Sequence, residues 1–325
     1  MLNRLHITMK TYEIEELRAV LPKGRTLFAY FKDKYCLQLL RYAIEEPVRV
    51  ASLRRHPVAS LLQKPMVKNL LATCGDRLDP QTLEWTAAAT PGFHYILTLG
   101  SWGRQDRVRV MQTTRKGTNL VLQLNFNNVH NQAFTRLIKP REGSDPFNYR
   151  GHPALKDARS NRRYTLGWAR LDMDLHAGEA LIEELQTDWL RQAQRISRFA
   201  TRLDDDAFTQ RFHRKFGANR NHFMIYYSNV LASHYAIWDE ALLCAVLFFL
   251  REELGIRKIW MHTPQSGVLL KKIRGTPPPI SLYSKLPQRF YFRAEDSLPE
   301  FLAQEREVMR TLRRHPGVGL QKFTL

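Results

Sequence analysis

The spacing of hydrophobic and polar residues changes along the chain and separates a helical part from a strand-rich part. Residues 11–86 carry apolar side chains at helical spacing, with prolines between the runs, which predicts a mainly helical region. From about residue 92 alternation takes over, and it predicts strands over 93–99, 107–111 and 119–126. Residues 139–163 are rich in Pro, Gly, Asp, Asn and Arg, so we expect a long loop there.

The clearest local unit is a β-hairpin over residues 165–188. Residues 165–174 alternate between apolar and polar, residues 176–178 supply the turn, and residues 179–188 return as the partner strand. The polar positions of both strands are expected on one face: Arg170, Asp172, Asp174, Glu184, Gln186 and Asp188. Several carboxylates should therefore be neighbours.

Helices and strands alternate after the hairpin. The pattern predicts helices over 189–199, 204–216 and 239–254, a strand over 256–262, an aromatic strand within 283–292 and a basic amphipathic helix over 297–314. These elements predict an α+β fold with three regions. A helical N-terminal region covers 1–90, a strand-rich middle with a long basic loop covers 91–163, and a mixed-sheet module covers 164–325.

Composition excludes several classes of protein. The 325 residues are 44% hydrophobic, which is enough for a substantial core. No window approaches the roughly 20 apolar residues that span a bilayer, and the N-terminus lacks the pattern of a secretory signal, so no membrane contact is expected. Cys36, Cys74 and Cys244 are odd in number and far apart, which fits neither a disulfide framework nor a CxxC metal site and predicts a reducing, cytoplasmic setting.

The formal net charge of +19 is unevenly distributed. Residues 1–70, 71–160 and 255–325 carry +7, +5 and +8, whereas residues 161–254 carry −1. Basic flanks favour contact with nucleic acid or another polyanion, since each neutralised phosphate contributes affinity. An Arg-rich surface that serves only solubility is the alternative, because no helix-turn-helix, zinc-finger or RNA-recognition pattern accompanies the charge. The nearly neutral segment holds the hairpin.

The carboxylates of the hairpin are the first candidates for chemistry. Crowded carboxylates raise one another's pKa, as a general base at neutral pH requires, and they can also bind a divalent metal or an amine substrate. A polar face that only meets solvent is the alternative, with Arg170 as a structural partner. Trp238 is suited to stacking on a ligand or to core packing. The sequence lacks HExxH, GxSxG and P-loop patterns, which disfavours zinc peptidases, classical serine hydrolases and P-loop NTPases.

The C-terminal half resembles the core of the GNAT N-acyltransferases. The order strand, strand, helix over 165–199 matches, as do FLREELGIRKIWMHT over 249–263 and LYSKLPQRF over 282–290, the latter similar to an LYxKLGF-type segment. In that family the helix after the second strand holds the pyrophosphate of coenzyme A at its N-terminus. The resemblance therefore implies acetyl-CoA or another acyl-CoA as donor and an amine as acceptor.

The resemblance also implies roles for individual residues. Glu184 or Asp188 would deprotonate the amine, and Tyr283 would protonate the leaving thiolate, although a core aromatic is the other interpretation of Tyr283. The pyrophosphate motif of the family, Q/R-x-x-G-x-G/A, aligns with Gln186, Trp189 and Arg191. Because Trp189 and Arg191 replace small residues, Trp189 is expected to crowd the phosphates and Arg191 to contact them by a different geometry.

A second resemblance concerns ALIEELQTDWLR over 180–191, which is similar to an EIQSDW signature of uncharacterised phage and mobile-element proteins. Taken together, these features predict a GNAT-like N-acyltransferase, functional or degenerate, acting on or near nucleic acid in such a context. The alternative is a non-catalytic basic protein that binds nucleic acid or serves assembly and keeps the fold without the cofactor. The sequence gives no indication of oligomeric state.

Overall fold

One mixed sheet of eight strands organises this computed structural model, which describes residues 9, 11–20, 26–103, 112–154, 164–273, 275 and 277–325. The strand order is β1-β4-β5-β6-β7-β8-β10-β9, and every neighbouring pair is antiparallel except β7 and β8. The strand bounds are β1 Thr26–Tyr30, β4 Phe93–Trp102, β5 Asn119–Asn125, β6 Thr165–Asp174, β7 Glu179–Gln186, β8 Lys258–His262, β9 Phe292–Glu295 and β10 Leu320–Phe323. A small second sheet pairs β2 Val48–Arg49 with β3 Arg77–Leu78. The predicted α+β class is confirmed.

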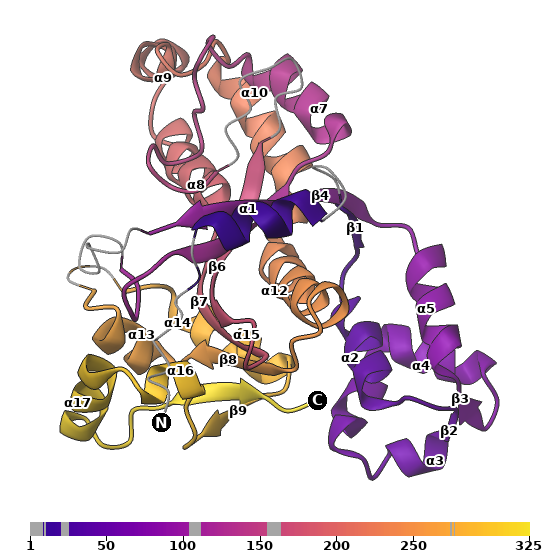
Figure 1. Ribbon diagram of the computed structural model, residues 1–325. Helices are drawn as coiled ribbons and strands as arrows, with labels where there is room; N and C mark the ends of the chain where they lie inside the picture. The colour runs from indigo at the N-terminus through magenta and orange to yellow at the C-terminus, as the bar shows by residue number, and fades with distance from the viewer. Residues whose placement is uncertain are drawn as a thin grey trace.

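The helices gather in groups around the sheet (Figure 1). An N-terminal group contains α2 Tyr35–Ala43, α3 Val50–Leu53, η1 Pro57–Gln63, α4 Pro65–Thr73 and α5 Pro80–Ala89, while α1 Thr11–Val20 lies beside β4. A second group contains α7 Asn128–Ile138, α8 Asp188–Ala200, α9 Asp205–Phe212, α10 Arg220–Ile225, η2 Tyr226–Leu231 and α11 Ala232–Tyr235. A third, near β8 to β10, contains α13 Pro264–Leu270, α14 Ile280–Tyr283, α15 Lys285–Arg289, α16 Glu300–Ala303 and α17 Arg306–Arg314. The sheet draws strands from all three regions predicted from the sequence.

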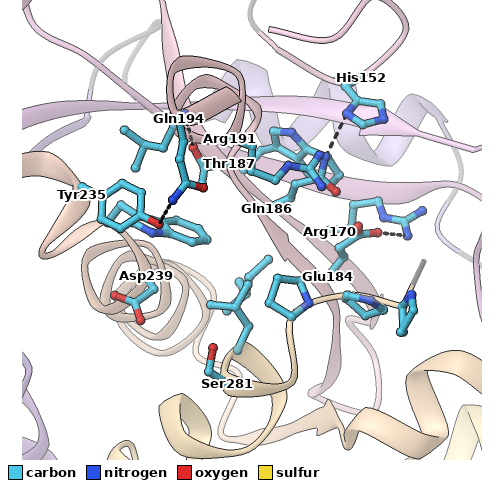
Figure 2. A pocket seen from close by; sticks show the side chains of 18 of the residues that line it. His152, Arg170, Glu184, Gln186, Thr187, Arg191, Gln194, Tyr235, Asp239 and Ser281 are labelled. Carbon is cyan, nitrogen blue, oxygen red and sulfur yellow. Dashed lines mark hydrogen bonds and ion pairs between the residues drawn. The ribbon is translucent and has the colours of Figure 1, made fainter. Parts of the chain in front are cut away.

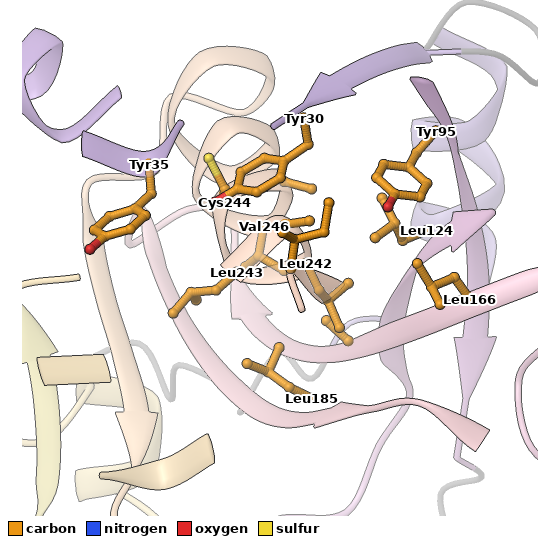
Figure 3. Packing of buried hydrophobic residues seen from close by; sticks show 14 of the residues in the cluster. Tyr30, Tyr35, Tyr95, Leu124, Leu166, Leu185, Leu242, Leu243, Cys244 and Val246 are labelled. Atoms are coloured by element: carbon orange, nitrogen blue, oxygen red, sulfur yellow. The ribbon is translucent and has the colours of Figure 1, made fainter. Parts of the chain in front are cut away.

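The central helix is α12, Trp238–Phe248, continued by η3, Phe249–Glu253. Every residue from Glu240 to Leu247 is buried, which explains why the sequence there is apolar all round. Its side chains pack against β5, β6 and β7, and Figure 3 shows Leu242 and Val246 lying among strand residues such as Leu124 and Leu185. The predicted buried helix over 239–254 is confirmed.

The predicted hairpin is also confirmed. β6 and β7 pair from Asp174↔Glu179 to Trp168↔Gln186, with the turn at 175–178. The register shifts once between Arg170↔Glu184 and Leu171↔Ile182, so Glu183 is the extra residue of a β-bulge. β7 ends two residues before the predicted strand end because Thr187 caps α8: its Oγ1 accepts from Leu190 N at 3.3 Å.

Three expectations about secondary structure need correction. Residues 26–30 lie inside the region predicted to be helical, yet they form β1 at the edge of the sheet, with Leu27 exposed and Phe28 and Tyr30 buried. The aromatic strand expected within 283–292 is wrong, because Tyr283, Leu286 and Phe290 are buried at helical spacing in and after α14 and α15. The helix expected over 297–314 is two short helices, α16 and α17, separated at 304–305.

The remaining predictions are settled in part. Strands over 93–99 and 119–126 are confirmed as β4 and β5, whereas the strand expected over 107–111 lies outside the described residues, as do residues 155–163 of the expected loop. Within the described ranges no single helix is long and apolar enough to cross a membrane. The pair Arg220–Tyr235 and Trp238–Glu253, bent by 44°, meets the length and composition criteria only when taken together.

Candidate functional site

The parallel strands β7 and β8 are paired over only the first half of β7, and a pocket lies beside the unpaired second half. Their pairing ends at Ile182↔Met261, but β7 continues to Gln186, so in the described chain residues 183–186 have no strand partner on that side. The pocket that opens there has a volume of about 980 Å³. Residues 184–186 of this unpaired strand end line the pocket, whereas the Glu183 carbonyl accepts from Lys271 Nζ.

Several elements bring polar side chains into this pocket (Figure 2). The end of β7 contributes Glu184 and Gln186, and the first turns of α8 contribute Arg191 and Gln194. Trp238 at the start of α12 and the prolines 277–279 also line the pocket. Cationic side chains outnumber carboxylates among the lining residues: Lys32, Arg170, Arg191 and Arg289 against Glu184 and Asp239. Each of these four cations is paired with a carboxylate, Lys32 and Arg289 with Glu240, Arg170 with Glu184 and Arg191 with Asp188, so the charge around the pocket is close to balanced.

Glu184 lies at the pocket floor between two cations. Its carboxylate pairs with Arg170 and lies 3.7 Å from Lys271 Nζ, which is itself buried. Burial alone raises the pKa of Glu184, but Lys271 and Arg170 outweigh it and hold the pKa below its ordinary value. The expected raised pKa from crowded carboxylates is therefore wrong for Glu184, since its near neighbours are cations.

Glu183 and Lys271 form part of a buried network that the sequence analysis missed. The bulge turns Glu183 away from the pocket, where its carboxylate accepts from Thr114 N at 2.9 Å and lies 3.2 Å from His262 Nε2. Lys271 Nζ donates to the Glu183 carbonyl at 2.9 Å. Burial lowers the pKa of His262, so a neutral imidazole caps an anionic Glu183. None of the three lines the pocket, and this network holds the bulged strand in place.

A second polar cluster, at the N-terminus of α8, surrounds Asp188. Its Oδ2 lies 2.7 Å from His152 Nδ1 and accepts from Trp168 Nε1 at 3.3 Å, while Oδ1 accepts from Gln186 and Arg191 at 2.8 and 2.7 Å. Burial alone raises the pKa of Asp188, but the hydrogen bond and charge of His152 outweigh it and lower the pKa. His152 lines the pocket and was not predicted, because it lies within a loop that has no periodic pattern.

The remaining predicted residues lie away from the cavity, apart from Trp238, which lines it. Asp172 is buried in an ion pair with Arg115, and Asp174 accepts from His176 N and Ala177 N at the hairpin turn. The carboxylates at 172, 174, 184 and 188 therefore do not converge. Among the residues that the structure describes, no cluster of three or more His, Cys, Asp and Glu side chains is placed to hold a metal ion.

Two of the three aromatic residues at the predicted site, Trp189 and Tyr283, are buried. Trp189 packs among Phe126, Phe134 and Phe147, and its Nε1 donates to Tyr226 Oη at 2.8 Å, so its indole does not crowd the pocket as expected. Tyr283 is fully buried, and burial, then Glu184, raises its pKa, so its hydroxyl is a poor proton donor. A comparison of the chain with protein-family models, curated proteins and solved structures finds no match.

Proposed function

We propose that this protein is a GNAT-like N-acyltransferase that binds an acyl-CoA in the pocket and transfers the acyl group to an amine on or near nucleic acid. The observation that carries the proposal is the separation of β7 from β8 beside the N-terminus of α8. An open strand edge pairs with the amides of an extended ligand, as in β-strand addition. A helix N-terminus with an adjacent arginine suits phosphates. Acyl-CoA combines both features.

The residues that replace the small positions of the family motif are compatible with this ligand. Trp189 is in the first turn of α8, and its indole points into the core. At this position only the backbone is left to contact a ligand. Arg191 lines the pocket with its side chain 54% exposed. Besides Arg191, three side chains contact the Asp188 carboxylate at the start of the helix: His152, Trp168 and Gln186. An anionic ligand therefore meets a guanidinium and not a bare carboxylate.

Calorimetry with acetyl-CoA tests the proposal. The wild-type protein should bind acetyl-CoA, and Arg191→Gln should weaken the affinity about ten- to a hundredfold, since a charge-assisted contact contributes about 1.5–3 kcal/mol. Arg195→Gln is the matched control, because Arg195 is exposed one turn further along α8 and outside the pocket. An absence of acetyl-CoA binding at millimolar concentration would contradict the proposal and favour the non-catalytic alternative.

A stripe of arginines supports the nucleic-acid part of the proposal. Arg191, Arg195 and Arg198 are all exposed and recur at i, i+4 and i+7, so they share one face of α8 that leads away from the pocket, and the exposed Arg202 follows in the turn after the helix end. Such a face can neutralise successive phosphates. It equally supports the second candidate function, a nucleic-acid-binding protein without the cofactor. We propose a cytoplasmic setting in either case, which the three free cysteines support.

A further inference from the structure

His152 and Asp188 form a pair that is built like the base and orienting acid of many enzymes. Asp188 is almost fully buried, with its side chain 1% exposed, and Nδ1 of His152 lies 2.7 Å from its Oδ2. Trp168 Nε1 and Gln186 Nε2 donate to the two carboxylate oxygens, which fixes the carboxylate. Asp188 is therefore locked in position to hold the imidazole.

The imidazole is fixed in the pocket wall by aromatic side chains. The His152 ring packs edge-on against Trp102 and Trp168, with centroids 6.1 and 5.5 Å apart, and lies against Tyr149. Its side chain is 28% exposed and lines the pocket. Nδ1 has two neighbours, Asp188 Oδ2 at 2.7 Å and Gln186 Nε2 at 3.0 Å. The shorter contact is with a charged acceptor, which favours the proton on Nδ1 and leaves Nε2 as the basic nitrogen. In the described part of the chain, no hydrogen bond engages Nε2.

We propose that His152 is the general base of the acyl transfer and that Asp188 is its positioning residue, an inference that rests on the proposed function. The amine nitrogen attacks the thioester carbonyl carbon, and its proton passes to His152 Nε2. The carbon–sulfur bond then breaks, and the imidazolium returns the proton to the departing thiolate. An amine and a thioester thus give an amide and a thiol, with no other reactant consumed.

Other groups around the pocket are less suited to this role. Glu184 is neutralised by Arg170 and Lys271, and the Tyr283 hydroxyl is buried behind it. The anionic Asp188 stabilises the imidazolium that forms during the reaction. The charged and titratable groups that face His152 are Asp188 and Arg191 of α8, Glu184 of β7, Arg170 of β6 and Tyr149 of its own loop, while Asp145 of that loop acts on Asp188.

Thiol release from acetyl-CoA, with n-butylamine as the acceptor, tests the assignment in the full-length chain. His152→Gln should lower the rate at least about a hundredfold, as for loss of a general base, while the dissociation constant for acetyl-CoA measured by calorimetry stays within about twofold. Asp188→Asn removes the carboxylate that favours the imidazolium, so the midpoint of the pH–rate profile should move to lower pH. His176→Gln, at the exposed hairpin turn, is the control and should retain the wild-type rate.

The outcomes separate this inference from the function on which it rests. If the wild type does not bind acetyl-CoA, the proposed function fails and the base assignment fails with it. If the wild type binds and turns over acetyl-CoA but His152→Gln is equally fast, only the base assignment is overturned. An unchanged pH midpoint in Asp188→Asn would overturn the positioning role, since a merely structural Asp188 predicts that result.

Discussion

Arg115 binds both carboxylate oxygens of Asp172 inside the protein, with Nε 2.7 Å from Oδ2 and a terminal nitrogen 2.9 Å from Oδ1. The two side chains are only 1% and 3% exposed, and the guanidinium lies over the ring of Phe301 at 4.2 Å. Burial raises the pKa of Asp172 and the Arg115 charge opposes this effect. The pair thus ties the segment before β5 to β6 and α16, and Asp172 serves the fold.

Breaking this buried pair should be costly. Asp172→Ala leaves a buried guanidinium without its partner, so the free energy of unfolding should fall by about 3–5 kcal/mol in urea titrations. Replacing both residues, as in Arg115→Met with Asp172→Leu, should recover much of that loss. The control is Asp205→Ala, which breaks an exposed pair with Arg220 and should cost under about 1 kcal/mol. Equal losses at the two sites would contradict this account.

Trp189 should matter for stability and not for ligand access. Its indole is fully buried among aromatic rings and hydrogen-bonded to Tyr226, so Trp189→Ala should lower the free energy of unfolding by about 3–5 kcal/mol. The folded variant should bind acetyl-CoA as the wild type does, since the indole does not line the pocket. Trp85→Ala, at a site 63% exposed, should change stability by no more than about 0.5 kcal/mol. Tighter acetyl-CoA binding by Trp189→Ala would show that the indole obstructs the ligand after all.

Sequence periodicity predicted the hairpin and the central helix because both depend on local spacing. Alternation in 165–174 follows from strand geometry, and the all-apolar run in α12 follows from burial on every side. The partners of the hairpin carboxylates could not be predicted in this way. Arg115 and His152 reach them from distant loops, and the bulge at Glu183 depends on register. The sequence analysis expected the hairpin carboxylates to repel one another. In the structure, tertiary contacts instead place a basic side chain beside Asp172 and beside Asp188.

The buried histidines of the second helical group should make the fold sensitive to acid. Burial lowers the pKa of His130 to about 3 and that of His234 to about 4, from an ordinary 6.5. Below pH 6.5 the unfolded chain binds protons that the folded chain does not, so stability is present above that pH and is lost on acidification. Each histidine should contribute a loss of about 1.4 kcal/mol per pH unit between pH 6 and 4.

Urea unfolding of His130→Phe at pH 7 and pH 5 measures this contribution. Phe fits the stack on Phe126, and Tyr226 keeps its hydrogen bond from Trp189, so the variant should fold. Its stability should fall less between pH 7 and pH 5 than that of the wild type, by about 2 kcal/mol. His176→Gln, which removes an exposed histidine, should show the wild-type dependence. A pH dependence unchanged in His130→Phe would mean that His130 does not cause the acid sensitivity.

The arginine stripe on α8 should set the salt dependence of nucleic-acid binding. For single-stranded DNA the slope of log K against log salt is about −0.7 per phosphate neutralised. Replacing Arg195, Arg198 and Arg202 with Gln should therefore make the slope shallower by about 2, as measured by fluorescence anisotropy with a labelled oligonucleotide. Arg191 is left in place because it pairs with Asp188 and lines the pocket.

A matched variant separates a defined surface from general positive charge. Arg306, Arg310 and Arg313 of α17 are also exposed, and replacing these three with Gln removes the same charge at another place. A polyanion that lies along α8 should be affected by the first triple substitution and much less by the second. Equal shifts in slope for both would show that the nucleic acid responds only to net charge, and the stripe would then have no role in directing it to the pocket.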